Sequence, residues 1–302
     1  MDSKPSYLVF GGKTGWVGQK LINLLQSQNI TVVAADSRLE NAQDVAAELD
    51  RIKPTNVLNA AGLTGRPNVD WCESHKMETT RVNVIGTLCL IDLCHQRNIH
   101  ITNFATGCIY HYDALDHLEG NGIGFTEADP PNFDGSFYSK TKAVVEDMIL
   151  ATGYTNVLQL RLRMPISDDL HHRSLVTKIT KYEKVVNIPN SMTVLHDMLP
   201  VAIAMGQANV VGVHNFTNPG AISHNEILTM YRDVVKKDFT WKNFTLEEHD
   251  KVVVAKRSNN ELDSSKLKGV CDKLNIELLE IHDAVRGVFE RMALADDTDG
   301  KK

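Results

Sequence analysis

A glycine-rich segment near the N-terminus constrains the fold of this chain most strongly. Gly12, Gly15 and Gly18 recur at every third position. They follow a short apolar run at residues 7–10 and precede a helical pattern at residues 20–25. Glycine lets the backbone turn tightly, and a helix N-terminus supplies N–H groups and the positive end of a dipole. This order of strand, glycine loop and helix predicts a segment that binds the pyrophosphate of a dinucleotide.

Strand-like and helix-like patterns then alternate through the first half of the chain. Strands are expected at residues 31–35, 56–61, 101–105 and 156–163, and helices at 42–52, 79–97 and 140–148. This alternation predicts a parallel sheet with helices on both faces. After Pro165 the alternation weakens. There we expect helices at 176–182, 196–208, 224–235 and 278–292, and strands at 185–188 and 211–216.

The predicted fold class is therefore α/β, with a Rossmann-type doubly wound parallel sheet and a smaller, discontinuous C-terminal lobe. The nucleotide-binding domain is expected to comprise residues 1–164 and about 193–218. The substrate-binding lobe would comprise about 165–192 and 219–295, followed by a disordered tail at 296–302. In such folds the ligand crevice lies at the carboxyl ends of the strands.

Composition limits the class of partner. The chain has 302 residues, 42% of them hydrophobic, and a formal net charge of −6. No basic stripe indicates nucleic acid or an anionic membrane, so a small-molecule partner is expected. The N-terminus carries no pattern of a targeting peptide, and no apolar run reaches the roughly 18 residues of a membrane span. The five cysteines lack metal-site spacing. We therefore expect a reduced, cytoplasmic protein without a metal site.

Tyr138 and Lys142 lie four residues apart at the start of a helical run, so a helix places them on one face. A phenol has a reference pKa of about 10. A cation about 4 Å away contributes roughly 4 kcal/mol at an effective dielectric near 20, or about three pKa units. The pair predicts a tyrosine that exchanges protons at neutral pH. The alternative is a surface tyrosine beside a solvated lysine, because this spacing is common by chance.

Residues at the end of the second predicted strand indicate which nicotinamide cofactor binds. Asp36, about twenty residues after the glycine loop, suits the ribose 2′-hydroxyl of NAD. Arg38 suits the 2′-phosphate of NADP, and its alternative is a solvated loop cation. We favour NADPH, with NADH also accepted. The predicted cofactor contacts are Gly12, Thr14, Gly15, Trp16, Val17, Gly18, Asp36, Arg38, Asn59, Ala60, Ala61, Tyr138 and Lys142.

These motifs together resemble the extended short-chain dehydrogenase/reductases, which also carry the Asn59-Ala60-Ala61-Gly62 stretch and a threonine, here Thr106, after the fourth strand. Longer blocks are similar to a narrower group, the bifunctional nucleotide-rhamnose synthase/epimerase-reductases, which are related to dTDP-4-dehydrorhamnose reductase. The blocks are residues 64–76, 105–109, 135–142, 163–167, 187–193 and 257–263. The resemblance runs from about Tyr7 to about Phe289.

The resemblance implies a substrate and two reactions. A nucleoside diphosphate (UDP or dTDP) 4-keto-6-deoxy-glucose would be epimerised at carbons 3 and 5, and its 4-ketone would then be reduced with a nicotinamide cofactor. The product would be the L-rhamnose nucleotide. In this group a separate domain or protein, a 4,6-dehydratase, makes the substrate, and nothing resembling it is present here. A homodimer is expected only by analogy of fold.

The resemblance also implies residue roles. Tyr138 would supply a proton and Thr106 would donate a hydrogen bond to the carbonyl oxygen. Cys108 matches a Cys-Ile-Tyr stretch whose cysteine, in the related GDP-fucose synthases, works with a distant histidine. Here Lys178, in a Thr-Lys-Ile stretch, would be the second member of the epimerisation pair. A lysine needs burial or a cationic neighbour to act as an acid near pH 7.

The candidate substrate contacts are nominated mainly by residue type. The residues of a type suited to a diphosphate, a sugar or a base are Arg66, Arg163, Arg257, Asn187 and Asn190. Each has a plain alternative as a loop or cap residue. Two other functions compete with the bifunctional one: a 4-ketoreductase in which Cys108 and Lys178 are incidental, and a non-catalytic, NADP-binding regulatory subunit on the same fold.

Overall fold

The computed structural model describes residues 5–65, 68–113, 115–245, 247–248, 251 and 254–299. Its main sheet contains strands β1 (Ser6–Phe10), β2 (Thr31–Ala34), β3 (Asn56–Asn59), β4 (His100–Thr106), β5 (Val157–Leu162) and β7 (Gly212–Asn215). The strand order is β2-β1-β3-β4-β5-β7, and the pairs β1–β2, β1–β3 and β3–β4 are parallel. The predicted α/β class with a Rossmann-like sheet is therefore confirmed.

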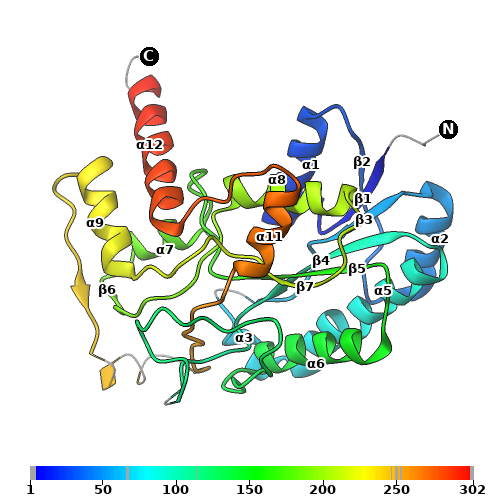
Figure 1. Cartoon of the computed structure of the whole chain (residues 1–302), viewed down its shortest axis with the longest axis horizontal. Helices are drawn as coiled ribbons and strands as arrows, with labels where there is room; N and C mark the ends of the chain where they lie inside the picture. The colour runs from blue at the N-terminus through cyan, green and yellow to red at the C-terminus, as the bar shows by residue number, and fades with distance from the viewer. Residues whose placement is uncertain are drawn as a thin grey trace. The chain divides into compact units, whose positions relative to one another are not determined.

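The helices are α1 (Trp16–Ser27), α2 (Ala42–Ile52), α3 (Trp71–Ser74), α4 (Lys76–Thr80), the π-helix η1 (Arg81–Gly86), α5 (Thr87–Gln96), α6 (Phe137–Thr152), α7 (Leu175–Ile179), α8 (Leu195–Gln207), α9 (His224–Val234), α11 (Ser265–Lys273) and α12 (Ile281–Asp299). A small second sheet pairs β6 (Lys184–Val185) with β8 (Lys242–Asn243). Figure 1 shows the order of these elements.

The chain divides into two compact, discontinuous units. The first contains Met1–Ile109, Pro131–Arg161 and Leu199–His214, and the second contains Tyr110–Pro130, Leu162–Met198 and Asn215–Lys302. The sequence had placed residues 110–130 in the nucleotide-binding domain, whereas they group with the second unit. The expected disordered tail is helical as far as Asp299, where α12 ends.

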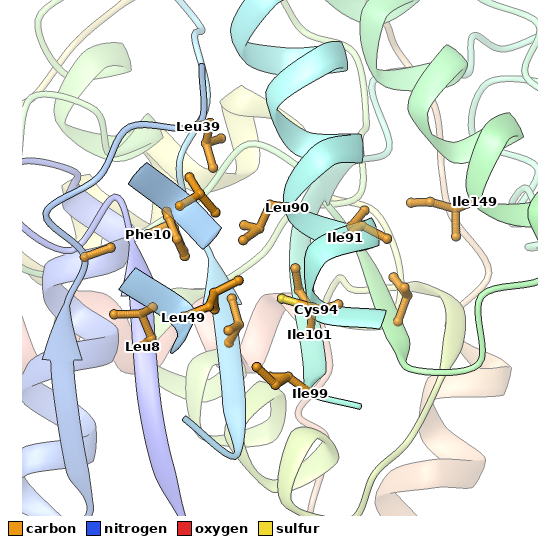
Figure 2. Packing of buried hydrophobic residues seen from close by; sticks show 14 of the residues in the cluster. Leu8, Phe10, Leu39, Leu49, Leu90, Ile91, Cys94, Ile99, Ile101 and Ile149 are labelled. Carbon is orange, nitrogen blue, oxygen red and sulfur yellow. The ribbon is translucent and has the colours of Figure 1, made fainter. Parts of the chain in front are cut away.

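The core of the first unit lies between the sheet and helices α2, α5 and α6. Figure 2 labels Leu8 and Phe10 of β1 and Leu90 and Ile91 of α5 within this cluster, and all four are fully or almost fully buried. Full burial of one such side chain contributes roughly 1.5–3 kcal/mol. The second unit has its own core around α7, α9 and α12. None of the described helices has both the length and the hydropathy needed to cross a bilayer.

The strand order fixes where a ligand can bind. β2 follows β1 in the chain on one side of the sheet, and β3 returns to pair with β1 on the other side. The order of the strands reverses at this point, because β2 lies on one side of β1 and β3 lies on the other. In open α/β sheets, ligands bind at such a switch point, beyond the carboxyl ends of the strands.

Candidate active site

The predicted glycine loop joins β1 to α1, and its glycine positions are packed too tightly for a side chain. A Cβ atom at Gly18 would lie 2.3 Å from the carbonyl oxygen of Gly11, and one at Gly15 would lie 2.5 Å from the same atom. Gly15 is the N-cap of α1, and no side chain caps the first turn. Because the glycines carry no side chains, the backbone can approach a phosphate closely, and the dipole of α1 favours the negative charge of that phosphate. The geometry therefore suits the pyrophosphate that the motif predicts.

The predicted ribose site lies after β2. Asp36 and Arg38 are both exposed, and Asp36 forms a salt bridge with Lys13 of the glycine loop. The buried carboxylate of Glu48 fixes this segment, because it accepts the N–H groups of Asp36 and Ser37, both at 2.9 Å. The sequence interpretation missed Lys13, which brings a cation to Asp36.

A ladder of buried amides crosses three neighbouring strands, β3, β4 and β5. The side chain of Asn59 on β3 donates to Asn103 on β4 at 2.8 Å, and Asn103 donates to Gln159 on β5 at 2.6 Å. All three are almost fully buried. Asn59 also accepts the N–H of Ala61, so the ladder fixes the start of the 59–62 loop. This loop passes so close to Gly11 that a Cβ there would lie 2.8 Å from the carbonyl oxygen of Ala60.

Asn83 connects this loop to the helix layer. It lies fully buried in η1, where its side chain accepts the N–H of Leu63 at 2.7 Å and donates to the carbonyl of Leu63 at 2.8 Å. A Cβ built on Gly62 would lie 3.5 Å from both the Asn83 Oδ1 and the Lys142 Nζ. Because π-helical turns often occur at functional sites, the irregular helix is itself a signal, but only the structure displays it.

Tyr138, Thr106 and Lys142 meet within the first unit. α6 begins after its N-cap, Ser136, and presents Tyr138 and Lys142 on one face. The hydroxyl of Tyr138 shares a hydrogen bond with the side chain of Thr106, at the end of β4. The Nζ atom of Lys142 lies 5.8 Å from the centre of the Tyr138 ring. The structure thus brings together the three residues that the sequence nominated for proton transfer.

The expected lowering of the pKa of Tyr138 by Lys142 is wrong for this structure. Burial raises the pKa of Tyr138 above its usual value, the nearby Cys108 raises it further, and the Thr106 hydrogen bond lowers it. Burial also lowers the pKa of Lys142 to about 8. Both changes have one cause: a pocket of low dielectric disfavours the phenolate and the ammonium alike. The lysine therefore gives up a proton more readily than expected.

Two thiols lie near this centre. Cys108 follows Thr106, and its backbone N–H donates to the Thr106 hydroxyl at 3.1 Å. Cys72 is fully buried on α3, where burial raises the pKa of its thiol and Lys142 lowers it. Its helix is tied to α6, because Glu73 accepts the N–H of Phe137 at 2.7 Å. Cys72 is a second residue that the sequence interpretation did not single out.

Lys178 belongs to the second unit, on the short helix α7. It is half-buried, and burial lowers the pKa of its ammonium group, with Arg173 lowering it further. Burial and a cationic neighbour are the two conditions under which a lysine acts as an acid near neutral pH. The structure supplies both, while the role of Lys178 stays a prediction.

Arg163 and Asn190 form a buried network in the second unit. The Arg163 guanidinium, 1% exposed, donates to the Asn190 side chain at 2.5 Å and to the backbone carbonyl of Ser258 at 2.9 Å. Asn190 is 2% exposed and also accepts the N–H of Asn260. These bonds hold the segments at residues 190–191 and 258–260 together. A direct contact of either residue with the substrate stays a prediction.

The other predicted substrate contacts differ in their surroundings. Asn187 is exposed. Arg257 is half-buried and donates to the carbonyl of Ala255 at 2.7 Å. Burial raises the pKa of Tyr182, and the charge of Arg257 opposes that rise. Arg66 lies outside the described residues. No group of three potential metal ligands occurs among the described residues.

Comparison with known proteins agrees with this geometry. The family model of the RmlD substrate binding domain matches residues 6–198. A bifunctional dTDP-4-dehydrorhamnose 3,5-epimerase/dTDP-4-dehydrorhamnose reductase of Arabidopsis thaliana is 57% identical over 268 residues, which are 88% of each chain. The solved UDP-rhamnose synthase of Acanthamoeba polyphaga mimivirus is 38% identical, with a TM-score of 0.89 over 96% of this chain and 100% of that one.

A longer relative in Arabidopsis thaliana is a trifunctional UDP-glucose 4,6-dehydratase/UDP-4-keto-6-deoxy-D-glucose 3,5-epimerase/UDP-4-keto-L-rhamnose-reductase. It is 55% identical over 291 residues, which are 96% of this chain and 43% of the relative. The chain therefore spans less than half of that protein.

Proposed function

We propose that this chain, which belongs to the family of the RmlD substrate binding domain, is a bifunctional 3,5-epimerase and 4-ketoreductase. Its substrate is a nucleoside diphosphate (UDP or dTDP) 4-keto-6-deoxy-glucose, and its product is the corresponding L-rhamnose nucleotide. The observation that carries the proposal is the 57% identity to a bifunctional epimerase/reductase over 88% of both chains. The meeting of Thr106, Tyr138 and Lys142 in the first unit supports the reductive half.

In the reduction, the chain positions the 4-ketone and supplies a proton. The nicotinamide cofactor, when bound, supplies the hydride. Tyr138 gives its proton to the ketone oxygen as that oxygen gains charge, and Thr106 donates a hydrogen bond to it. Lys142, with a pKa of about 8, returns a proton to the tyrosine. The buried pocket strengthens these interactions because little water screens them.

In the epimerisation, the 4-ketone acidifies the hydrogens on carbons 3 and 5. Cys108 removes a proton, which leaves an enolate on the oxygen that Tyr138 and Thr106 address. Lys178 returns a proton on the opposite face of the sugar. The lowered pKa of Lys178 supports this role.

The cofactor is NADPH, with NADH also accepted. The bare glycine loop and the Gly15 cap of α1 hold the pyrophosphate. The ion pair of Lys13 with Asp36, which offsets the charge of that carboxylate, and the cation Arg38 two residues further along the chain support a preference for the 2′-phosphate.

The remaining expectations concern the surroundings of the protein. A separate 4,6-dehydratase supplies the substrate. All five cysteines are free thiols, which supports a reducing, cytoplasmic location. A homodimer stays a prediction from the analogy of fold.

Product analysis tests the proposal. The protein is incubated with UDP-4-keto-6-deoxy-glucose and NADPH, cofactor oxidation is followed, and the sugar is identified by NMR; the dTDP substrate is compared in parallel. An L-rhamnose nucleotide is the expected product. A D-configured 6-deoxy sugar would mean a ketoreductase alone. Cofactor binding without oxidation would mean a non-catalytic, NADP-binding subunit.

A further inference from the structure

The short helix α3 contacts the first turn of α6, the helix that carries Tyr138 and Lys142. Both helices are labelled in Figure 1 and belong to the first unit. The side chain of Glu73 on α3 accepts the backbone N–H of Phe137 at 2.7 Å. Phe137 is the first residue of α6 and directly precedes Tyr138. A residue 64 positions earlier in the chain therefore holds the backbone next to the reactive phenol.

This bond supplies a partner that the helix itself does not provide. The first four N–H groups of an α-helix have no acceptor within the helix. In α6 the N-cap Ser136 accepts the N–H of Ser139 at 3.1 Å, which leaves the N–H of Phe137 to a group outside the helix. Glu73 is that group, and its negative charge lies at the positive end of the helix dipole. Without Glu73, a partly buried N–H next to Tyr138 loses its acceptor.

Two neighbouring residues on α3 and α4 extend the attachment. The ammonium group of Lys76, at the start of α4, lies 5.5 Å from the centre of the Phe137 ring. The buried thiol of Cys72 lies within electrostatic reach of both Tyr138 and Lys142. The attachment therefore involves the ring of Phe137 as well as its backbone, and it reaches the pocket of the two reactive side chains.

α3 is itself fixed by contacts on both sides. A helix of four residues is not stable alone, so its surroundings must hold it. The ring of His75, which follows α3, stacks on Trp71 with ring centres 3.8 Å apart and an angle of 7° between the planes. The Thr79 hydroxyl donates to the carbonyl of His75 at 2.8 Å, and the N–H of Cys72 donates to the carbonyl of Val69 at 3.0 Å. The carboxylate that reaches α6 therefore projects from an anchored element.

The influence of Glu73 on the reactive groups is geometric. Burial, nearby thiols and the Thr106 hydrogen bond account for the shifted pKa of Tyr138. Burial and the Cys72 thiol account for that of Lys142. An uncharged side chain with an acceptor oxygen in the same place should therefore replace Glu73.

We propose that Glu73 is a positioning residue for the reduction: its bond to the Phe137 N–H fixes the first turn of α6 and so sets where the Tyr138 hydroxyl meets the ketone oxygen. The inference rests on the proposed role of Tyr138 as the proton donor. Thr106 belongs to β4 and Tyr138 to α6, so a movement of the helix alone would separate these two donors. A displacement of about 1 Å can slow a reaction about a hundredfold.

Three variants of the full chain test this role: Glu73→Ala, Glu73→Gln and the control Glu78→Ala, which removes an exposed glutamate of α4. Stopped-flow measurement of NADPH oxidation in a single turnover, with saturating UDP-4-keto-6-deoxy-glucose, gives the rate of reduction. Glu73→Ala should lower this rate about tenfold to hundredfold and leave the dissociation constant of NADPH unchanged. Glu73→Gln, which keeps an acceptor oxygen, should restore most of the rate, and Glu78→Ala should not change it.

Amide hydrogen exchange provides a readout that does not depend on activity. The peptide at residues 137–142 should exchange faster in Glu73→Ala than in the wild type, while the peptide of α2 should not change. The role of Glu73 is overturned if this exchange is unchanged in Glu73→Ala, if it rises while the single-turnover rate stays at the wild-type value, or if Glu73→Gln is as slow as Glu73→Ala. A wild type that oxidises no NADPH is a different failure, because it refutes the proposed function whatever the exchange shows.

Discussion

At the scale of single residues, Lys142 has conflicting effects on stability and chemistry. It lies 8% exposed on α6, and burial lowers the pKa of its ammonium from 10.5 to about 8. In the unfolded chain the pKa returns to its ordinary value. Between pH 8 and 10 the unfolded state therefore binds more protons than the folded state, and stability rises with pH. Below pH 8 the buried ammonium of Lys142 lowers the free energy of unfolding by its full amount.

We expect Lys142→Met to abolish reduction and to stabilise the fold. At pH 7 the free energy of unfolding should rise by up to about 3 kcal/mol, because the buried ammonium is gone. The gain should disappear as the pH approaches 10. Urea unfolding across this range measures it, with Lys140→Met, an exposed neighbour on α6, as the control. A variant that is less stable than the wild type at pH 7 would contradict the account.

The choice of cofactor also depends on single residues. Lys13 pairs with Asp36, and Arg38 lies two residues further along the chain. If these cations bind a 2′-phosphate, Lys13→Ala with Arg38→Ala should raise KM for NADPH roughly tenfold to hundredfold. KM for NADH should change far less. Initial rates with each cofactor give the two KM values. If KM rises equally for NADPH and NADH, these two residues do not determine a preference for NADPH.

At the scale of elements, a buried ion pair anchors α6, the helix that carries Tyr138 and Lys142. Arg161 on β5 contacts Glu146 on α6 at 2.6 Å, with side chains 1% and 4% exposed. Glu146 lies one helical turn beyond Lys142, so the pair fixes the part of α6 that presents the proton-transfer residues. A buried charge without its partner is strongly destabilising, whereas replacing both charges by apolar groups is often nearly neutral.

Glu146→Gln should therefore lower the free energy of unfolding by about 3–5 kcal/mol. The double variant Glu146→Met with Arg161→Met should recover most of that loss. Chemical denaturation provides both values, and Asp147→Asn, an exposed neighbour, should have almost no effect. If the double variant is as unstable as the single one, the ion pair is not what couples α6 to β5.

The sequence predicted some elements well because their ends have local signals. The helix expected at 42–52 matches α2, whose N-cap Asn41 accepts the N–H of Asp44 and whose C-cap Lys53 is left-handed. The single helix expected at 79–97 is instead α4, η1 and α5. Nothing local indicates that break, since Asn83 bonds to Leu63, twenty residues away.

At the scale of the whole molecule, distant pairing limited what the sequence could predict. Residues 110–130 fall inside the nucleotide-binding domain that the sequence predicted at 1–164. In the structure Phe125 bonds through its backbone to Glu261 and Asp263, so this segment belongs to the second unit. The position of the glycine loop was predictable because it directly follows β1 and precedes α1 in the chain. The network of Arg163 was not, because its partners are 27 and 95 residues away.

The central claim is that one chain both epimerises and reduces the same sugar. Incubation with UDP-4-keto-6-deoxy-glucose and NADPH in heavy water, followed by NMR of the product, tests it most directly. The account predicts an L-rhamnose nucleotide with deuterium at carbons 3 and 5, and a Cys108→Ser variant that binds cofactor but loses the exchange. A reduced product without deuterium at these carbons, or exchange at the wild-type rate in Cys108→Ser, would contradict it.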